Sequence, residues 1–118
     1  MKEEFRREVY VYKDYFWNFY EEQNKDVQKK IDWVVKLIEE VRMVPEKYFK
    51  HIESTDGLYE IRVQAGSDIY RIFSFFDEGN LIILLNGFQK KSDRTPKGQI
   101  DRAEKLRKEY YNEKSKSK

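Results

Sequence analysis

Residues 57–91 contain three apolar segments of β-strand character separated by two short turns, and this pattern limits the chain to few possible folds. The segments read GLYEIRV, IYRIFSFF and LIILLNGFQKK. The turns AGSD and DEGN supply the Gly, Asp and Asn residues that tight hairpins favour. Strands joined by such turns pair as antiparallel neighbours. The centre of the protein is therefore predicted to be a three-stranded antiparallel meander.

A helical hairpin is predicted before the meander. Apolar residues recur every three or four positions between Val27 and Val41, Asn24 can cap this helix, and Pro45 follows it. An aromatic segment at residues 14–23, which begins with a possible Asp cap, predicts a shorter helix immediately before it. Because the link between them is so short, we expect the two helices to pack antiparallel.

The remaining segments complete the predicted fold. β-branched and aromatic residues at 7–12 predict a short first strand, and residues 49–57 are interpreted as a loop. Thr95 as N-cap and Pro96 at the first helical position predict a last helix that ends near residue 111. The predicted order is β-α-α-β-β-β-α. This is an α+β fold with a mostly antiparallel four-stranded sheet, the helical hairpin on one face and a C-terminal helix.

Composition narrows the class of protein. With 118 residues the chain has room for one core, so we expect a single domain at 1–112 and a disordered Lys/Ser-rich tail at 113–118. Cysteine is absent, which excludes disulfides and thiolate metal sites, and the scattered carboxylates predict no other metal site. The apolar runs are too short to span a bilayer and the N-terminus has no signal-peptide pattern, so a cytoplasmic protein without a membrane partner is expected.

Positive charge is concentrated near the C-terminus. Residues 1–89 contain 13 Lys and Arg against 17 Asp and Glu, a net charge of −4, whereas residues 90–118 contain 11 against 5, a net charge of +6. A basic end on an acidic body indicates a face that binds a polyanion. The alternative is a solvated basic helix with a frayed tail.

Cations occur in strands where apolar residues are expected. Four-residue turns would place Arg62 opposite Arg71, and Arg71 opposite Asn86, so that all three project from one face. Phe88 and Lys90 would lie further along that face. A charge in an apolar strand needs a partner, and two guanidinium groups match the oxygens of a phosphate well. We interpret the partner as a phosphate from outside the chain.

The alternative partner is an acid of the chain itself, such as Glu60, Asp68 or a helix carboxylate. The same register also divides the apolar residues between the two faces of the sheet. One set should lie under the last helix, namely Phe73, Phe75, Ile82 and Leu84. The other set should pack against the helical hairpin, namely Tyr59, Ile61, Val63, Tyr70, Ile72, Ile83 and Leu85.

The order of elements, the arginine of strand 58–65, the YRI sequence at 70–72, and LLNGFQKKS followed by TPKGQIDRA resemble the RelE/ParE toxin superfamily. Within it, the chain is most similar to phage-derived RelE-like, HigB-type toxins of type II toxin–antitoxin systems, over roughly residues 10–110. The resemblance implies a sheet with two helices on one side and a concave, mRNA-cleaving face on the other. It also implies a ribosome-dependent endoribonuclease that inhibits translation and is neutralised by a helix-turn-helix, HigA-like antitoxin.

The resemblance assigns roles to individual residues. Arg62 and Arg71 match the arginines of the second and third strands, and Lys90 and Lys91 match the paired lysines, so these four form the expected catalytic set. Phe88 matches the aromatic residue of the GF-x-KK motif, which could stack on a base. Binding of RNA or the ribosome is expected from Asn86, Phe88, Lys97, Arg102, Lys105 and Arg107.

The expected chemistry is cleavage of mRNA by its own 2′-hydroxyl, without a metal or other cofactor. The arginines would stabilise charge, and one of the paired lysines would move a proton. Relatives often have His where this chain has Asn86, and the one histidine, His51, is expected in a loop, so the general base stays unassigned. Two alternatives remain open, a ParE-like toxin that poisons gyrase and a catalytically inactive RNA-binding relative.

Overall fold

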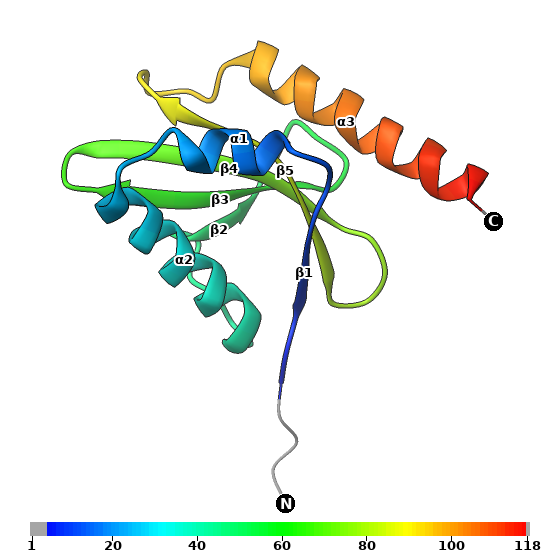
Figure 1. Cartoon of the computed structure of the whole chain (residues 1–118), viewed down its shortest axis with the longest axis horizontal. Coiled ribbons are helices and arrows are strands. Elements are labelled where there is room, and N and C mark those ends of the chain that lie inside the picture. Colours follow the sequence, from blue (N-terminus) through cyan, green and yellow to red (C-terminus); the bar gives the residue numbers. More distant parts are fainter. Residues whose placement is uncertain (1–4, 118) are drawn as a thin grey trace, which may run out of the picture.

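The computed structural model describes residues 5–117 and contains one five-stranded mixed sheet and three helices (Figure 1). The elements in chain order are β1 (Glu8–Val11), α1 (Tyr15–Glu21), α2 (Lys25–Glu40), β2 (Phe49–His51), β3 (Leu58–Ala65), β4 (Asp68–Phe76), β5 (Leu81–Lys90) and α3 (Lys97–Lys116). The strand order is β1-β5-β4-β3-β2, and β1 runs parallel to β5 while the other neighbours are antiparallel. The predicted α+β class is confirmed, but the predicted four-stranded sheet is wrong.

The additional strand, β2, lies in the segment that the sequence indicated to be a loop. It pairs antiparallel with β3, and Lys50 lies opposite Glu60. A strand of three residues is too short to give a clear period-two pattern, which is why residues 49–57 carried no strand signal. The consequence for function is that β2 brings a lysine onto the sheet next to the predicted arginines.

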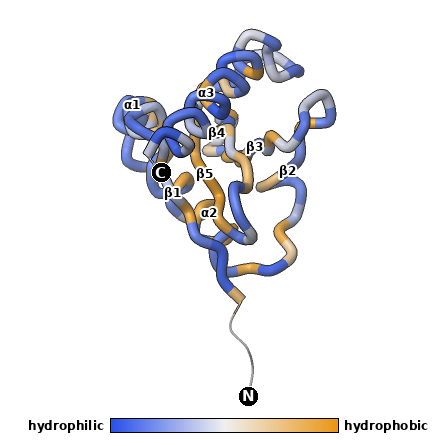
Figure 2. The backbone as a smooth tube through the Cα atoms, turned by 90° about the vertical axis from the view of Figure 1, so that its right-hand side faces the viewer, coloured by the Kyte–Doolittle hydropathy of each residue, from blue (hydrophilic) through white to orange (hydrophobic). Residues whose placement is uncertain are grey.

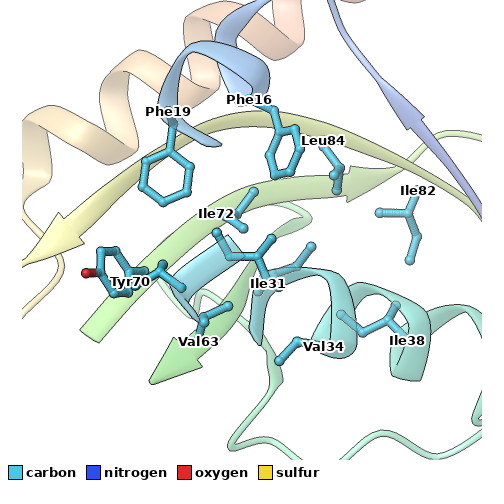
Figure 3. Close-up of a cluster of buried hydrophobic side chains, with 12 residues drawn as sticks. Phe16, Phe19, Ile31, Val34, Ile38, Val63, Tyr70, Ile72, Ile82 and Leu84 are labelled. Carbon is cyan, nitrogen blue, oxygen red and sulfur yellow. The ribbon is translucent and has the colours of Figure 1, made fainter. Parts of the chain in front are cut away.

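The two predicted helices before the meander are present, and each packs mainly on the sheet, α1 on β5 and α2 on β3; we call the pair the helical hairpin. Asn24 caps α2, since its Oδ1 accepts a hydrogen bond of 3.0 Å from the backbone N–H of Val27. Figure 3 shows side chains of α1 and α2 directed toward those of the strands. At the core of this contact, Gly87 lets α1 approach β5 closely, because a Cβ there would lie 2.5 Å from Cδ2 of Phe19.

Helix α3 covers part of the opposite face of the sheet. Its buried residues Ala103 and Leu106 join a second core cluster with Phe73 and Phe75 of β4. Figure 2 shows the hydrophobic residues concentrated in the strands, whereas α3 is largely hydrophilic. The sheet is therefore the middle layer between the helical hairpin and α3.

The predicted register is right for one strand pair and wrong for the next. Arg62 lies opposite Arg71, as the AGSD turn predicted. Between β4 and β5, however, Phe76 pairs with Ile82, one residue further along β5 than predicted. Beyond an irregularity in that pairing, Arg71 lies opposite Phe88, two residues further along than predicted.

The first shift comes from a longer turn and the second from a β-bulge. Between Ile72 and Ser74 the register shifts, so that Leu85 and Asn86 both lie opposite Phe73. Before the bulge, a shift of one residue exchanges the two faces, so the predicted face assignments of β5 are wrong there. Ile82 and Leu84 pack in the core under the helical hairpin, and Ile83 and Leu85 pack in the core under α3.

Beyond the bulge the second shift restores the original alternation. Phe88 pairs with Arg71 and Lys90 pairs with Ile69, so both residues lie on the face of the arginines, as predicted. Beyond the bulge, the two one-residue shifts in register add up to two residues, so each side chain of β5 is again on its predicted face. The predicted faces are therefore wrong only in the apolar part of β5, before the bulge.

The ends of α3 also differ from the prediction. Thr95 does not cap the helix; Pro96 occupies the N-cap position and the Thr95 hydroxyl instead donates a hydrogen bond to Glu60. The helix continues to Lys116, so the segment from 113 to 116 is its last turn rather than a disordered tail. Residues 1–4 and Lys118 lie outside the described part of the chain. Within that part, no helix combines the length and apolar character needed to cross a membrane.

Candidate active site

Two arginines converge on one carboxylate at the end of the sheet that α3 leaves uncovered. The Nε atoms of Arg62 and Arg71 lie 3.6 and 3.5 Å from Oε2 of Glu60. Glu60 is buried, and its other carboxylate oxygen accepts the hydrogen bond from Thr95. Of the alternatives left open by the sequence, the internal partner is present, and it is Glu60.

Two lysines add positive charge around the same carboxylate. Lys50 of β2 lies opposite Glu60, and both residues line a cavity together with Lys90 from the end of β5. Arg62 and Thr95 line this cavity as well, and the acids Glu53 and Asp93 are exposed along it. We call Lys50, Glu60, Arg62, Arg71 and Lys90 the arginine cluster. It contains four cations and a single carboxylate.

The cations of the arginine cluster are only partly satisfied. Burial, together with the positive charge of Arg62, lowers the pKa of Arg71, which Glu60 offsets in part. Burial and the nearby Arg71 likewise lower the pKa of Lys90. Within residues 5–117, the buried Nε atoms of Arg62 and Arg71 have no hydrogen-bond acceptor in good geometry. A buried N–H without an acceptor is unfavourable, so the two guanidinium groups retain donors that the carboxylate of Glu60 leaves unused.

Asn86 and Phe88, predicted to contact RNA, are directed toward α3 instead. Asn86 is 2% exposed, and its Nδ2 donates a hydrogen bond of 3.4 Å to Oε1 of Gln99. The ring of Phe88 stacks on that of Phe73, with centroids 5.6 Å apart. Neither residue lines the cavity of the arginine cluster. Because the bulge holds Asn86 under α3, the prediction that it contacts RNA is not supported by its position.

The other predicted residues divide into exposed cations and one structural arginine. Lys91 is exposed beyond the end of β5 and lies outside the arginine cluster. Arg107 is half-buried and donates a hydrogen bond of 2.6 Å to the carbonyl of Asp56, so it holds α3 against the loop before β3. The three other predicted cations of α3 are exposed to solvent, namely Lys97, Arg102 and Lys105.

His51 lies in β2 rather than in a loop, at the rim of the same cavity. It pairs with Tyr59, whose ring centroid is 5.3 Å from that of the imidazole. Neighbouring residues of a strand point to opposite faces, so the imidazole is on the face opposite to Glu60. The geometry therefore gives His51 no direct role beside the arginines. Within residues 5–117, no three His, Asp or Glu side chains gather as ligands for a metal ion.

Residues 18–108 match the family described as phage-derived protein Gp49-like (DUF891). The chain belongs to the Gp49-like family. This is a RelE-like toxin family, so the resemblance seen in the sequence is confirmed at that level. The match extends from α1 into α3 and includes every residue of the arginine cluster. Comparison of this Gp49-like protein with curated proteins found no match.

Sequence reasoning missed Lys50 and Thr95, and it treated Glu60 only as an alternative partner. Glu60 and Arg62 are two residues apart in one strand, so they share a face, and this spacing was a usable signal. No comparable signal existed for Lys50, because its place depends on a three-residue strand, or for Thr95, because its contact depends on the path of residues 91–96.

Proposed function

We propose that this Gp49-like protein is a HigB-type toxin of a type II toxin–antitoxin system and a ribosome-dependent mRNA endoribonuclease. One observation carries the proposal: a buried carboxylate, Glu60, lies within ion-pair distance of two arginines in a cluster with an excess of positive charge. Such a cluster favours a phosphodiester, since it offers both cations for the phosphate and a group that can accept a proton.

The proposed reaction breaks the RNA at a phosphate held by Arg62 and Arg71. Glu60 accepts the proton of the 2′-hydroxyl, and the 2′ oxygen then forms a bond to phosphorus. The arginines stabilise the negative charge that develops on the phosphate oxygens. As the bond from phosphorus to the 5′ oxygen breaks, Lys90 donates a proton to that oxygen. The products are a 2′,3′-cyclic phosphate and a 5′-hydroxyl.

The environments of the two proton-transfer groups support these roles. Thr95 holds one oxygen of Glu60, which fixes the orientation of the carboxylate in the cavity. The lowered pKa of Lys90, which follows from burial and from Arg71, makes its ammonium group a stronger acid than an ordinary lysine. Lys91 is exposed and shares neither environment, so we assign the proton donor to Lys90.

The partners in this proposal are the ribosome, mRNA and a helix-turn-helix, HigA-like antitoxin. Membership of a RelE-like toxin family supports pairing with an antitoxin. The exposed Lys97, Arg102 and Lys105 of α3 are suited to phosphate groups of ribosomal RNA. A ribosome would also fix the mRNA in the reactive orientation, which contributes greatly to the rate of such a reaction.

The test is an in vitro translation reaction followed by primer extension on the mRNA, with wild-type protein, Glu60→Gln and the control Lys36→Gln. Lys36 is exposed on α2 and should have no effect. We expect discrete cuts that require translating ribosomes and that fall by about 100-fold or more in Glu60→Gln. Intact mRNA with the wild-type protein would contradict the proposal, and DNA breaks in the presence of gyrase would replace it with the ParE-like alternative. Unchanged cutting by Glu60→Gln would show that Glu60 is not the base.

A further inference from the structure

A second cavity lies along the outer edge of β3, next to the arginine cluster. Since β2 contains only Phe49–His51, the edge of β3 beyond Arg62 has no strand beside it. A cavity of about 470 Å³ occupies this position. Arg62 lines both this cavity and that of the arginine cluster. We call the new feature the β3-edge cavity.

The lining of the β3-edge cavity is cationic. Lys30 of α2 and Lys47 of the segment before β2 line it together with Arg62 and Arg71, and no Asp or Glu side chain does. In the part of the chain from residue 5 to residue 117, neither Lys30 nor Lys47 forms an ion pair. Four cations that surround one cavity without a carboxylate create a strong local preference for an anion.

Aromatic rings accompany these lysines. The Nζ of Lys30 lies 4.6 Å from the ring centroid of Trp33, and that of Lys47 lies 5.0 Å from the ring centroid of Tyr48. The two rings meet edge to face with centroids 5.3 Å apart, and Trp33 is 47% exposed. Cations beside an exposed aromatic ring such as Trp33 suit single-stranded nucleic acid, which offers both phosphates and bases. A free phosphate would use only the cations.

We propose that the β3-edge cavity is a second RNA subsite, which binds a backbone phosphate next to the scissile one and stacks a base on Trp33. This rests on the proposed function, since it extends the same RNA strand past Arg62. The Nε of Arg62 faces Glu60 at 3.6 Å, while its Nη1 donates a hydrogen bond of 3.2 Å to the carbonyl of Glu46 beside Lys47. The guanidinium group of Arg62 thus borders both cavities, and one RNA strand can pass along it from the cavity of the arginine cluster to the β3-edge cavity.

Binding is measured by fluorescence anisotropy with a single-stranded 2′-O-methyl RNA of nine nucleotides, which has no 2′-hydroxyl and cannot be cut by this chemistry. The variant Lys30→Glu/Lys47→Glu is compared with Lys29→Glu/Lys36→Glu, which changes the net charge equally at two exposed positions of α2. We expect the first to bind at least tenfold more weakly than the control. Its salt dependence should also fall by about 0.7 in slope, because the subsite holds one phosphate and each phosphate contact to a single strand contributes about 0.7.

Two further measurements test whether weaker binding comes from loss of the subsite or from a folding defect. If the charge-reversal variant does not fold, the neutral variant Lys30→Gln/Lys47→Gln takes its place, and it should also bind the nonamer more weakly than the wild-type protein. In a Trp17→Phe background, Trp33 is the remaining tryptophan of the chain and reports directly on stacking. The nonamer should quench its fluorescence, and inorganic phosphate should not.

Equal binding by the subsite variants and the control would overturn the proposal. Saturable binding of inorganic phosphate that excludes the nonamer would overturn it as well, because the ligand would then be a free phosphate. Since binding is measured without cleavage, the two proposals fail separately. A wild-type protein that binds the nonamer through Lys30 and Lys47 but never cuts mRNA contradicts the proposed function and leaves the subsite in place.

Discussion

The arginine cluster and the contact between Asp77 and α3 both contain a buried carboxylate next to cations, but they differ in how completely the charges are neutralised. Asp77 accepts hydrogen bonds of 2.7 Å from the hydroxyl of Tyr110 and from Nζ of Lys114. One carboxylate thus meets one principal cation and one hydroxyl. Glu60 instead faces two arginines, with two further lysines in the same cluster.

The pKa shifts show that the fold stabilises the charged side chains of one region and destabilises those of the other. Burial alone would raise the pKa of Asp77, yet the hydrogen bonds from Lys114 and Tyr110 lower it, and Asp77 raises the pKa of Lys114. Both charged forms are therefore stabilised by the fold. In the arginine cluster, burial and like charge lower the pKa values of Arg71 and Lys90, so their charged forms are destabilised. The charges of the Asp77 contact are neutralised within the protein, whereas the arginine cluster has more cations than its one carboxylate can neutralise, as the proposed phosphate site requires.

The largest effect that this comparison predicts is the loss of cleavage activity in the Arg71→Met variant, which keeps an unbranched apolar side chain but removes the guanidinium group and its charge. We expect cleavage to fall by about 100- to 1,000-fold, because one of the two groups that stabilise the phosphate is lost. Stability should change little, because Glu60 keeps Arg62 as a cationic partner and no buried carboxylate is left unpaired. Primer extension and thermal unfolding measure the two effects. A large loss of stability would show that Arg71 is a structural residue like Asp77.

The next effect concerns the pH dependence of cleavage. A proton donor is active while it is protonated, so cleavage should decline as the pH rises through the pKa of Lys90. Because that pKa is lowered, the decline should begin below the ordinary lysine value of roughly 10.4. Lys90→Arg should lose about 100-fold in rate and should lack this decline. A parallel pH profile in wild type and Lys90→Arg would assign the proton donor elsewhere.

A smaller effect, on stability alone, is expected for Asp77→Asn. Weakening charge-assisted hydrogen bonds to a buried carboxylate should cost on the order of 1.5 kcal/mol at neutral pH, with cleavage unchanged. The native pKa of Asp77 is below its unfolded value of roughly 3.9, so its stabilisation is present above that pH and is lost as the pH falls through the native pKa. Urea unfolding of wild type and variant should therefore converge in acid. A difference that persists there would point to packing rather than charge.

The smallest effect is expected at an exposed ion pair, where solvent already satisfies the charges. Lys13 contacts Glu109 at 2.6 Å and Glu113 at 2.8 Å, but all three side chains are largely exposed. Lys13→Gln should lower the Tm by no more than about 2 °C, and added salt should remove the difference. A larger, salt-insensitive change would mean that α3 depends on this contact as it does on Asp77.

The sequence was most informative where local patterns act alone. The stripe of α2, its Asn24 cap and the turn that places Arg62 opposite Arg71 all depend on residues close together in the chain, and all are confirmed. The sequence was least informative where a side chain can bond either to a neighbouring residue or to a distant segment. Thr95 looked like a helix cap, but the carboxylate of Glu60, 35 positions away, takes its hydroxyl instead.

The sequence by itself determined the class of fold and the cationic face, because hydrophobic periodicity and strand alternation are local properties of the chain. Only the tertiary structure decided how that face is completed. The bulge opposite Phe73 set the register of β5, and the short strand β2 brought Lys50 to Glu60. Each of these depends on packing between segments distant in sequence, and such packing leaves little trace in the order of residues within any one segment.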